Sequence, residues 1–315
     1  MRIIHLSDIH LFCQKAVVPK KVLNKRLIGL SNWYLKRRKI VDLGLLDLLG
    51  KKIRKLRPDI ICITGDLVHL AFQEEFVLAR DWLKGLCRIS RVKIVPGNHD
   101  LYIKEAEQDM TKYLSPFFSL APAENPHKNR GHKSYFPALD ILDECAFIGL
   151  SSAEPCGILK ASGTVGKRQL EELSRLLKAL KEKNIFRVIL IHHPILPGVV
   201  SRRKELKDYD QLLRVLGRHG VELVLFGHVH KRFSSGPCGP LSETLCLSAP
   251  SATSKEKNVQ KRAGFNLINI SKCKKEWEIF VEDHVLSECG VYFKVCKNFN
   301  FRTSGLDQET VLVQD

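Results

Sequence analysis

Several features that mark secreted or membrane-spanning proteins are missing from this sequence. None of its apolar runs approaches the roughly eighteen residues that a membrane-spanning helix needs. None of its ten cysteines lies in a Cys-x-x-Cys pair, which argues against a zinc ribbon, and Cys62 lies within a run that is typical of a buried strand. A strand-like run that begins almost at Met1 leaves no room for a signal peptide. We therefore expect a cytoplasmic protein with reduced cysteines, most of them in the core.

Acidic residues are also scarce relative to basic ones. The chain has 34 aspartates and glutamates against 51 lysines and arginines, a formal net charge of +17. Such an excess indicates an anionic partner, which could be a nucleic acid, a phosphorylated substrate or a membrane surface, and composition does not choose among them. With 315 residues, 44% of them hydrophobic, the chain can bury a large core, and one elaborated domain fits as well as two.

What the chain does contain is a set of polar residues directly after strand-like runs. These endings are Asp8-Ile9-His10, Gly65-Asp66, Gly97-Asn98-His99-Asp100, His192-His193-Pro194 and Gly227-His228-Val229-His230. Each has an ordinary explanation on its own, because such residues are common in turns. Open α/β sheets gather ligand sites at the carboxyl ends of their strands. Carboxylates, imidazoles and one amide at successive strand ends therefore predict a metal site.

The rest of the chain shows a regular alternation of helix and strand. Helical spacing of apolar residues predicts helices over residues 43–56, 72–86, 101–119 and 169–183, with the strand-like runs between them. This alternation is typical of a layered α/β core. Runs at residues 244–247, 265–270 and 277–281 predict closing strands. A further aromatic strand pattern covers residues 291–295, and beyond Thr303 the chain turns polar and acidic.

Residues 14–39 interrupt the alternation with a basic amphipathic segment. Its apolar stripe consists of Leu23, Leu27, Leu30 and Tyr34. The spacing predicts a helix with lysines and arginines on its other faces. This helix either packs its stripe on the body of the protein, or serves as a lid or lipid-binding arm. In the second interpretation, Trp33 and Tyr34 lie at a membrane interface, and the basic run 36–39, with Arg37 and Arg38, contacts lipid headgroups or phosphates.

The ordered motifs resemble those of the calcineurin-like metallophosphoesterase superfamily, which run Asp-x-His, Gly-Asp, Gly-Asn-His-Asp/Glu, His and Gly-His-x-His. Every block is present here, in order and over most of the chain. The resemblance implies a four-layer α-β-β-α sandwich of two mixed sheets and a dinuclear-metal hydrolase. We assign residues 1–284 to the phosphoesterase domain, with residues 14–39 as its insertion. Residues 285–315 are then a C-terminal extension whose end we expect to be disordered.

The same resemblance implies roles for single residues. One metal ion is implied at Asp8, His10, Asp66 and His230, and the other at Asp66, Asn98, His192 and His228, with Asp66 bridging. Mixed nitrogen and oxygen ligands suit Mn²⁺, Fe or Zn²⁺ rather than Ca²⁺, and we expect two divalent ions, with Mn²⁺ preferred.

Four neighbouring residues are candidates for other roles. His99, which is not needed as a ligand, is our candidate for protonating the leaving oxygen. Asp100 either orients His99 or caps the following helix. His69 and His193 are near enough to contact substrate, and each is as easily a packing residue.

Three classes of function compete at such a site. A non-catalytic scaffold is disfavoured because no ligand position is missing. A nuclease or a cyclic-nucleotide phosphodiesterase explains the positive charge, but basic residues interleaved with Leu, Ile, Trp and Tyr at helical spacing favour an amphiphilic substrate. A nucleic acid is therefore not the expected partner.

More narrowly, the chain resembles the LpxG-type UDP-2,3-diacylglucosamine pyrophosphatases of chlamydial bacteria. The resemblance lies in the start Ser7-Asp8-Ile9-His10, in the basic-apolar insertion through residues 33–39, and in Gly65-Asp66-Leu67-Val68-His69. It implies hydrolysis of the diphosphate of a UDP-linked diacyl sugar to UMP and 2,3-diacylglucosamine 1-phosphate, a step in lipid A biosynthesis. It also implies peripheral association with the cytoplasmic face of the inner membrane. The nuclease or cyclic-nucleotide phosphodiesterase remains the alternative.

Overall fold

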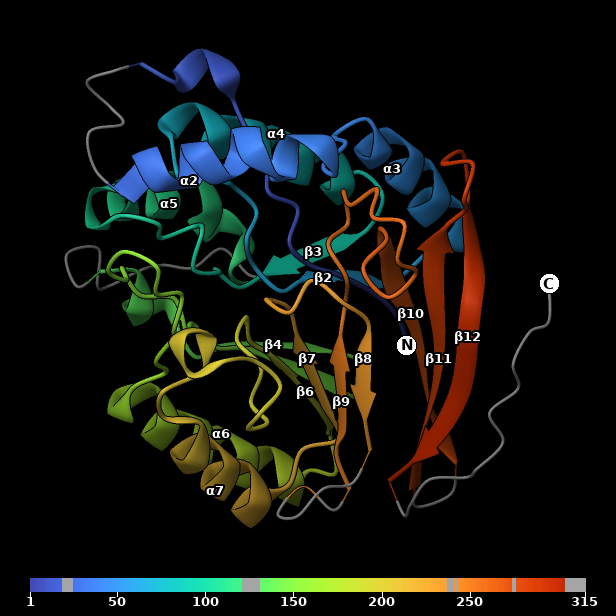
Figure 1. Cartoon of the computed structure of the whole chain (residues 1–315). Coiled ribbons are helices and arrows are strands. Elements are labelled where there is room, and N and C mark those ends of the chain that lie inside the picture. Colours follow the sequence, from blue (N-terminus) through green and yellow to red (C-terminus); the bar gives the residue numbers. More distant parts are fainter. Residues whose placement is uncertain (19–24, 121–130, 237–240, 242, 274–275, 304–315) are drawn as a thin grey trace.

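Two six-stranded sheets lie face to face between two layers of helices (Figure 1). The computed structural model describes residues 1–18, 25–120, 131–236, 241, 243–273 and 276–303. In the first sheet the strand order is β12-β11-β10-β1-β2-β3, and in the second it is β4-β5-β6-β7-β9-β8. Each sheet contains both parallel and antiparallel pairs, so the predicted four-layer sandwich of two mixed sheets is confirmed.

The first sheet combines a parallel half with an antiparallel half. Its strands are β1 (Arg2–Leu6), β2 (Ile60–Ile63), β3 (Arg91–Ile94), β10 (Gly264–Cys273), β11 (Glu276–Leu286) and β12 (Phe293–Arg302). The helices above it are α3 (Leu45–Leu56), α4 (Gln73–Cys87) and α5 (Glu107–Leu114). β2 is buried along its whole length, which is why its sequence is apolar throughout rather than alternating.

The second sheet is mostly parallel and has its own helical cover. Its strands are β4 (Ala138–Leu142), β5 (Cys145–Gly149), β6 (Phe186–Leu190), β7 (Leu223–Phe226), β8 (Phe233–Ser235) and β9 (Leu245–Ser248). The helices α6 (Lys167–Glu182) and α7 (Tyr209–His219) pack beneath it. Leu173, Leu177 and Leu180 are buried at helical spacing on α6, which explains the amphipathic pattern of that segment.

Single-turn 3-10 helices account for several differences from the predicted boundaries. They are η1 (Gln14–Ala16), η2 (Arg37–Lys39), η3 (Lys104–Ala106), η4 (Ser115–Phe117), η5 (His132–Tyr135) and η6 (Arg202–Lys204). The helix predicted over residues 101–119 is therefore wrong in extent, since only α5 is α-helical there. Pro116 lies in η4, where its ring and missing N–H are incompatible with a helix interior.

The C-terminal part of the chain belongs to the first sheet. The boundary predicted between residues 284 and 285 falls within β11, and β12 pairs antiparallel with β11 from Phe293 to Arg302. The predicted loose end at residues 304–315 lies outside the described residues. Of the described cysteines, only Cys62, Cys145 and Cys246 are buried, so the expectation that most lie in the core is wrong.

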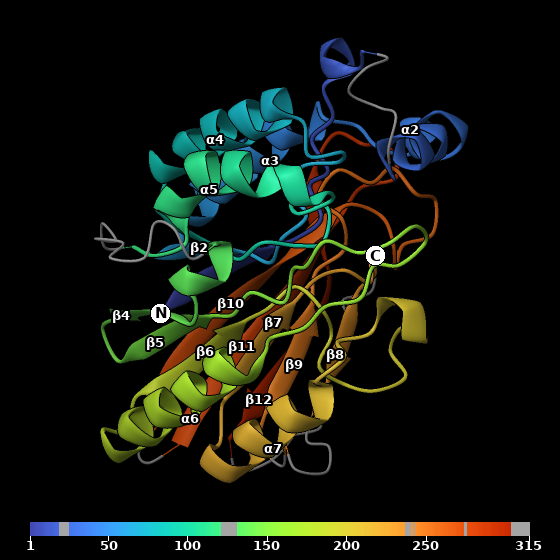
Figure 2. The ribbon, with the colours of Figure 1, turned by 90° about the vertical axis from the view of Figure 1, so that its left-hand side faces the viewer.

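The insertion forms a helix, although its buried face differs from the predicted one. Helix α2 (Lys25–Leu35) buries Gly29 and Trp33, whereas Leu27 is 52% exposed and Tyr34 is 40% exposed. The helix backbone approaches the body closely at Gly29, where a Cβ would overlap Leu70. Of the predicted stripe, the half-buried Leu30 packs against the core, whereas Leu27 and Tyr34 are exposed and Leu23 lies outside the described residues. Figure 2 shows α2 set apart from α3, α4 and α5. No helix among the described residues is long and apolar enough to cross a membrane.

Candidate metal centre

The carboxyl ends of strands from both sheets meet at one place. The backbone N–H of Asp8 donates to the carbonyl of Gly65 at 3.1 Å, which joins the loops after β1 and β2. His192 Nδ1, after β6, lies 2.7 Å from the carbonyl oxygen of Thr64, which joins the second sheet to the first. The N–H of Gly227, after β7, donates to the carbonyl of His192 at 3.0 Å. The N–H of His99, after β3, donates to Asp66 Oδ1 at 2.7 Å. These bonds place the predicted ligand loops around one point, as expected for parallel strands that end together.

The ligand loops adopt backbone conformations that ordinary residues avoid. The left-handed residues here are Asp8 (φ 53°), His10 (φ 51°), Asp66 (φ 53°), His228 (φ 68°) and His230 (φ 52°). Such conformations cost about 1–3 kcal/mol each and persist where the surroundings enforce them. At Asp8, the Ser251 hydroxyl donates to the carbonyl at 2.7 Å and helps to hold it.

Two glycines of the motifs are required by close approach. A Cβ at Gly97 would overlap Asp66 Oδ1, and a Cβ at Gly227 would overlap Ser7 Oγ. The Gly-Asn and Gly-His steps in the sequence therefore allow the loops to close around the carboxylates.

The first predicted ligand group comes together from three strand ends. Its members Asp8, His10, Asp66 and His230 form one cluster in which a metal ion could be held. His10 Nε2 lies 3.7 Å from Asp8 Oδ1 and 3.7 Å from Asp66 Oδ2. His230 Nε2 lies 3.1 Å from Asp8 Oδ1 and 3.2 Å from His10 Nε2.

The second predicted group shares Asp66 with the first. His192 Nε2 lies 3.4 Å from Asp66 Oδ1 and 3.2 Å from the carbonyl oxygen of the Asn98 side chain. His228 Nδ1 lies 3.2 Å from the same His192 nitrogen. Asp66 thus turns one oxygen toward each group, which is the arrangement that a bridging ligand requires.

The donor atoms fit two metal ions. Ligand atoms bound at about 2.1 Å to one ion lie roughly 3 to 3.5 Å apart, which matches most of these separations. Asp8 Oδ1 is buried, and its polar neighbours include the predicted ligand nitrogens of His230 and His10, at 3.1 and 3.7 Å. The mixture of imidazole, carboxylate and amide donors suits a borderline or hard divalent cation.

The protonation states of the cluster agree with this fit. Burial lowers the pKa of His10 and of His228, so both imidazoles are neutral and able to ligate. Burial raises the pKa of Asp66, and the adjacent charge of Asp8 raises it further. Divalent cations between these carboxylates would relieve both effects.

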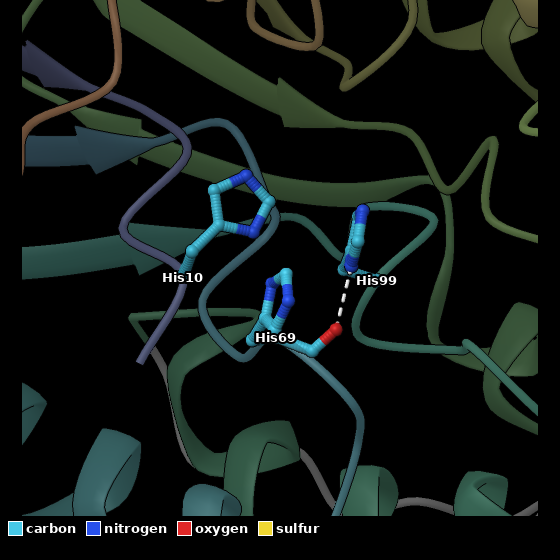
Figure 3. A group of neighbouring side chains, drawn as sticks. All are labelled: His10, His69 and His99. Atoms are coloured by element: carbon cyan, nitrogen blue, oxygen red, sulfur yellow. Dashed lines mark hydrogen bonds between the residues drawn. The ribbon is translucent and has the colours of Figure 1, made fainter. Parts of the chain in front are cut away.

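His99 is the only predicted catalytic side chain that faces this centre without belonging to it. Its Nδ1 lies 2.6 Å from the backbone carbonyl oxygen of His69, so Nδ1 donates and Nε2 is left free (Figure 3). Asp100 does not orient His99, contrary to the prediction. Its carboxylate instead accepts from the N–H groups of Val68 and Gly97 at 3.0 and 2.8 Å, which also leaves it no role as a helix cap.

The two histidines proposed as substrate contacts differ in their surroundings. His193 is fully buried, with Nδ1 2.8 Å from Ser152 Oγ and Nε2 3.1 Å from the carbonyl oxygen of Ala161. Both of its nitrogens are engaged, so the substrate-contact prediction for His193 is wrong and it is a packing residue. His69 lines a cavity of about 310 Å³ together with Asn98 and His99.

The side chains of the insertion that were predicted to contact lipid or substrate differ in their exposure to solvent. Trp33 is only 8% exposed and packs against Phe12, with 4.1 Å between ring centroids, so its prediction as an interfacial residue is wrong. Tyr34 and Arg38 are exposed and lie beside each other, 6.0 Å from guanidinium carbon to ring centroid. Arg37 turns inward, with Nη1 3.4 Å from His69 Nδ1. This guanidinium disfavours a third cation among His10, His69 and His99, although their ligand atoms are mutually close.

Other residues of the cavity were not singled out from the sequence. Lys25 Nζ lies 4.4 Å above the ring of Tyr102, which stacks at 5.2 Å on the ring of His99. Leu159 and Lys160 also line the cavity. The only signal for Tyr102 is its position two residues after the Gly-Asn-His-Asp motif, and no pattern marks the other three.

A four-layer sandwich with two clusters of ligands that share one aspartate defines a dinuclear metallophosphoesterase. The comparison with protein families agrees: the chain belongs to the calcineurin-like phosphoesterase family, whose model matches residues 1–232.

Known relatives include enzymes with two kinds of activity. A manganese-dependent ADP-ribose/CDP-alcohol diphosphatase from Arabidopsis thaliana is 29% identical over 108 residues, which are 32% of this chain and 34% of the relative. A probable cyclic nucleotide phosphodiesterase from Synechococcus is 27% identical over 190 residues, 58% of this chain and 62% of the relative. Both matches span less than two thirds of the relatives' own length. A dimetal phosphatase from Danio rerio shares the fold, with a TM-score of 0.55, 15% identity, and coverage of 95% of this chain and 98% of that one.

Proposed function

We propose that this chain hydrolyses the diphosphate of UDP-2,3-diacylglucosamine to UMP and 2,3-diacylglucosamine 1-phosphate. The observation that carries the proposal is the composition of one cavity. Asn98 and His99 line it beside Ile28, which is 38% exposed, and Leu159, which is 69% exposed. Apolar side chains left exposed on two walls of a metallophosphoesterase cavity suit a substrate that carries both phosphate and acyl chains.

The residues of the metal centre have assigned roles in this proposal. Asp8, His10, Asp66 and His230 would hold one divalent ion, and Asp66, Asn98, His192 and His228 would hold the other. Two bound cations would lower the pKa of a bridging water and neutralise the attacked phosphate. Mn²⁺ is the proposed metal, which the mixed donor set and the manganese-dependent relative support.

His99 completes the chemistry as a general acid. Its Nδ1 is held by the His69 carbonyl, so a proton on Nε2 is directed into the cavity. Burial lowers the pKa of His99, so the free ring is neutral and keeps its proton on Nδ1. A second proton, taken up at Nε2 when the anionic substrate binds, can pass to the leaving oxygen as the phosphoanhydride bond breaks.

We propose that the outer surface of α2 associates with the cytoplasmic face of the inner membrane. Leu27 and Leu35, 52% and 71% exposed, lie on this surface with Tyr34. The exposed Lys36, Arg38 and Lys39 follow directly. A basic side chain near an anionic surface contributes about 1 kcal/mol, so this cluster would favour binding together with the apolar contacts.

A product analysis tests the substrate. The Mn²⁺-loaded protein is incubated separately with UDP-2,3-diacylglucosamine, 3′,5′-cyclic AMP and single-stranded DNA, and the products are separated. We expect UMP and the lipid 1-phosphate from the first substrate and at most slow turnover of the other two. Rapid turnover of the cyclic nucleotide or of DNA, with the lipid intact, would refute the proposal.

A cyclic-nucleotide phosphodiesterase is the second candidate. The observation in its favour is the longer match to the Synechococcus relative, 58% of this chain against 32% for the diphosphatase. A nuclease would use the same metal centre. Neither accounts for the apolar side chains exposed at the cavity, which is why we place the lipid substrate first.

A further inference from the structure

Arg37 lies beside the metal centre without a counterion. Its guanidinium makes one polar contact among the described residues, from Nη1 to His69 Nδ1 at 3.4 Å. No carboxylate of the described part of the chain forms an ion pair with it, although its side chain is only partly exposed. A cation that is withdrawn from water without an anionic partner is unfavourable. Such a position is stabilised when an anion binds.

The backbone at Arg37 is tied to the loop that carries the first ligands. Its carbonyl accepts from Ile40 and Val41 at 3.0 and 2.9 Å. The next residue, Asp42, donates its N–H to the carbonyl of Thr253 at 2.8 Å. The Thr253 hydroxyl in turn donates to the carbonyl of Ile9 at 2.9 Å, between Asp8 and His10 in the chain. The place of Arg37 is therefore set by the metal-site loops and not only by helix α2.

The charge of Arg37 interacts with residues of the metal centre. Burial lowers the pKa of Arg37, whereas the carboxylates of Asp66 and Asp8 favour its charged form. Arg37 in turn contributes to the lowered pKa of His10 and of His99, after burial. These mutual effects agree with the contact between Arg37 and His69, which places the guanidinium beside the metal centre.

The charge balance then indicates the kind of anion. Two divalent ions contribute four positive charges, and Asp8 and Asp66 contribute two negative ones. With Arg37 the centre carries a surplus of three, which one phosphodiester charge does not neutralise. A diphosphate, with its second ionised phosphate, matches the surplus better, and the planar guanidinium is suited to bind two of its oxygens.

We infer that Arg37 binds the distal phosphate of a diphosphate substrate, the phosphate that is not attacked, and so makes the site prefer phosphoanhydrides to single phosphodiesters. This inference rests on the proposed diphosphate hydrolysis and deepens it by assigning the second phosphate. Lys25 and Lys160 line the cavity, and Lys25 lies 4.4 Å above the ring of Tyr102, whereas Arg37 contacts His69 beside the metal centre. Through Arg37, the insertion would thus contact the substrate at the phosphate that is not attacked.

A binding experiment separates the second phosphate from the first. Mn²⁺-loaded protein is titrated by calorimetry with AMP and with α,β-methylene-ADP, which differ by one non-hydrolysable phosphate. The wild type should bind the methylene analogue about 10- to 100-fold more tightly than AMP, the range expected for charged hydrogen bonds. In Arg37→Ala this ratio should fall to within about 3-fold, with AMP binding unchanged, and Arg37→Lys should lie between.

Two controls make the result decisive. The Mn²⁺ content and melting temperature of each variant show whether the centre is intact. Arg214→Ala removes an arginine of α7 whose Nη2 is 2.5 Å from Asp210 Oδ2 on the protein surface, and it should leave both affinities unchanged. An equal loss of affinity for both ligands in Arg37→Ala, or an unchanged ratio, would overturn the inference.

A kinetic comparison distinguishes failure of this inference from failure of the proposed function. ADP-ribose and bis(p-nitrophenyl) phosphate offer the wild type a soluble diphosphate and a single phosphodiester. Hydrolysis of the phosphodiester alone would reject the proposed function, while the binding ratio still decides the role of Arg37. Hydrolysis of the diphosphate by wild type and Arg37→Ala at the same kcat/KM would reject Arg37 and leave the function standing.

Discussion

His99 Nδ1 lies 2.6 Å from the backbone carbonyl oxygen of His69, so a main-chain atom and not a carboxylate sets the orientation of the proposed general acid. A carbonyl accepts a hydrogen bond in either protonation state of the ring, so it holds the tautomer without adding negative charge. The rings of His69 and His99 also stack, with 5.3 Å between centroids. Orientation of His99 therefore depends on the loop after β2 keeping its place.

Replacing His99 should slow the chemistry without removing metal. We expect His99→Ala to keep its Mn²⁺ content and to lose about 10²- to 10⁴-fold in kcat, the usual contribution of a general acid. Metal content by mass spectrometry and kcat on the diphosphate substrate check this. A substrate with a very good leaving group should suffer much less, since that group needs no proton. Loss of metal, or equal slowing on both substrates, would instead assign His99 a different role.

Asp66 should matter to both metal ions at once. One of its oxygens faces His10 at 3.7 Å and the other faces His192 at 3.4 Å. We expect Asp66→Asn to lower metal occupancy at both positions and to reduce turnover by roughly 10²-fold or more, because a charged bridging ligand is lost. Circular dichroism should remain that of the wild type. Wild-type turnover with full metal content in this variant would show that the two-metal assignment is wrong.

The ligand set could be predicted from sequence because each ligand follows a strand end in a short motif, and β-strands that end together bring such motifs together. Tertiary contacts that leave no local pattern in the sequence could not be predicted in this way. Asp100 satisfies the N–H of Val68, 32 residues away in sequence, a partner that no spacing suggests. Likewise, the spacing of apolar residues in α2 predicted that Leu27 and Tyr34 face the core. In the structure Trp33 is buried instead, on the face where Gly29 allows a close approach to Leu70. The buried face of the helix is therefore the one that carries Gly29 and Trp33.

The exposed and buried apolar residues of α2 should separate substrate binding from stability. Changing Leu27 and Leu35 to Ser should raise KM for the diacylated substrate and weaken vesicle binding, with the melting temperature unchanged, because both side chains are exposed. Trp33→Ala is the contrasting variant, since Trp33 is buried against Phe12 and His69. It should lower the free energy of unfolding by about 3 kcal/mol or more.

Kinetic data on two substrates decide whether the α2 surface serves lipid. Hydrolysis of a small soluble phosphodiester should be the same for the Leu27 and Leu35 double variant as for the wild type. If the soluble and diacylated substrates lose equally, the lipid-binding role of this surface is wrong, and the cyclic-nucleotide candidate gains support.

Glu75 should make stability depend on pH through the loop that carries His69. Its carboxylate accepts from the N–H groups of Leu70 and Phe72 at 2.9 and 3.2 Å, and burial raises its pKa to about 7. The folded protein therefore binds this proton more tightly than the unfolded chain, so the contribution of Glu75 to stability is present below pH 4.5 and is lost as pH rises to about 7. Urea unfolding of wild type and Glu75→Gln, both metal-free, measures this at pH 5 and pH 8. Between these values the difference in unfolding free energy should shift by about 2 to 3 kcal/mol in favour of the variant. The histidine clusters titrate equally in both proteins and cancel in the difference, so a pH-independent difference would show that Glu75 is ionised throughout.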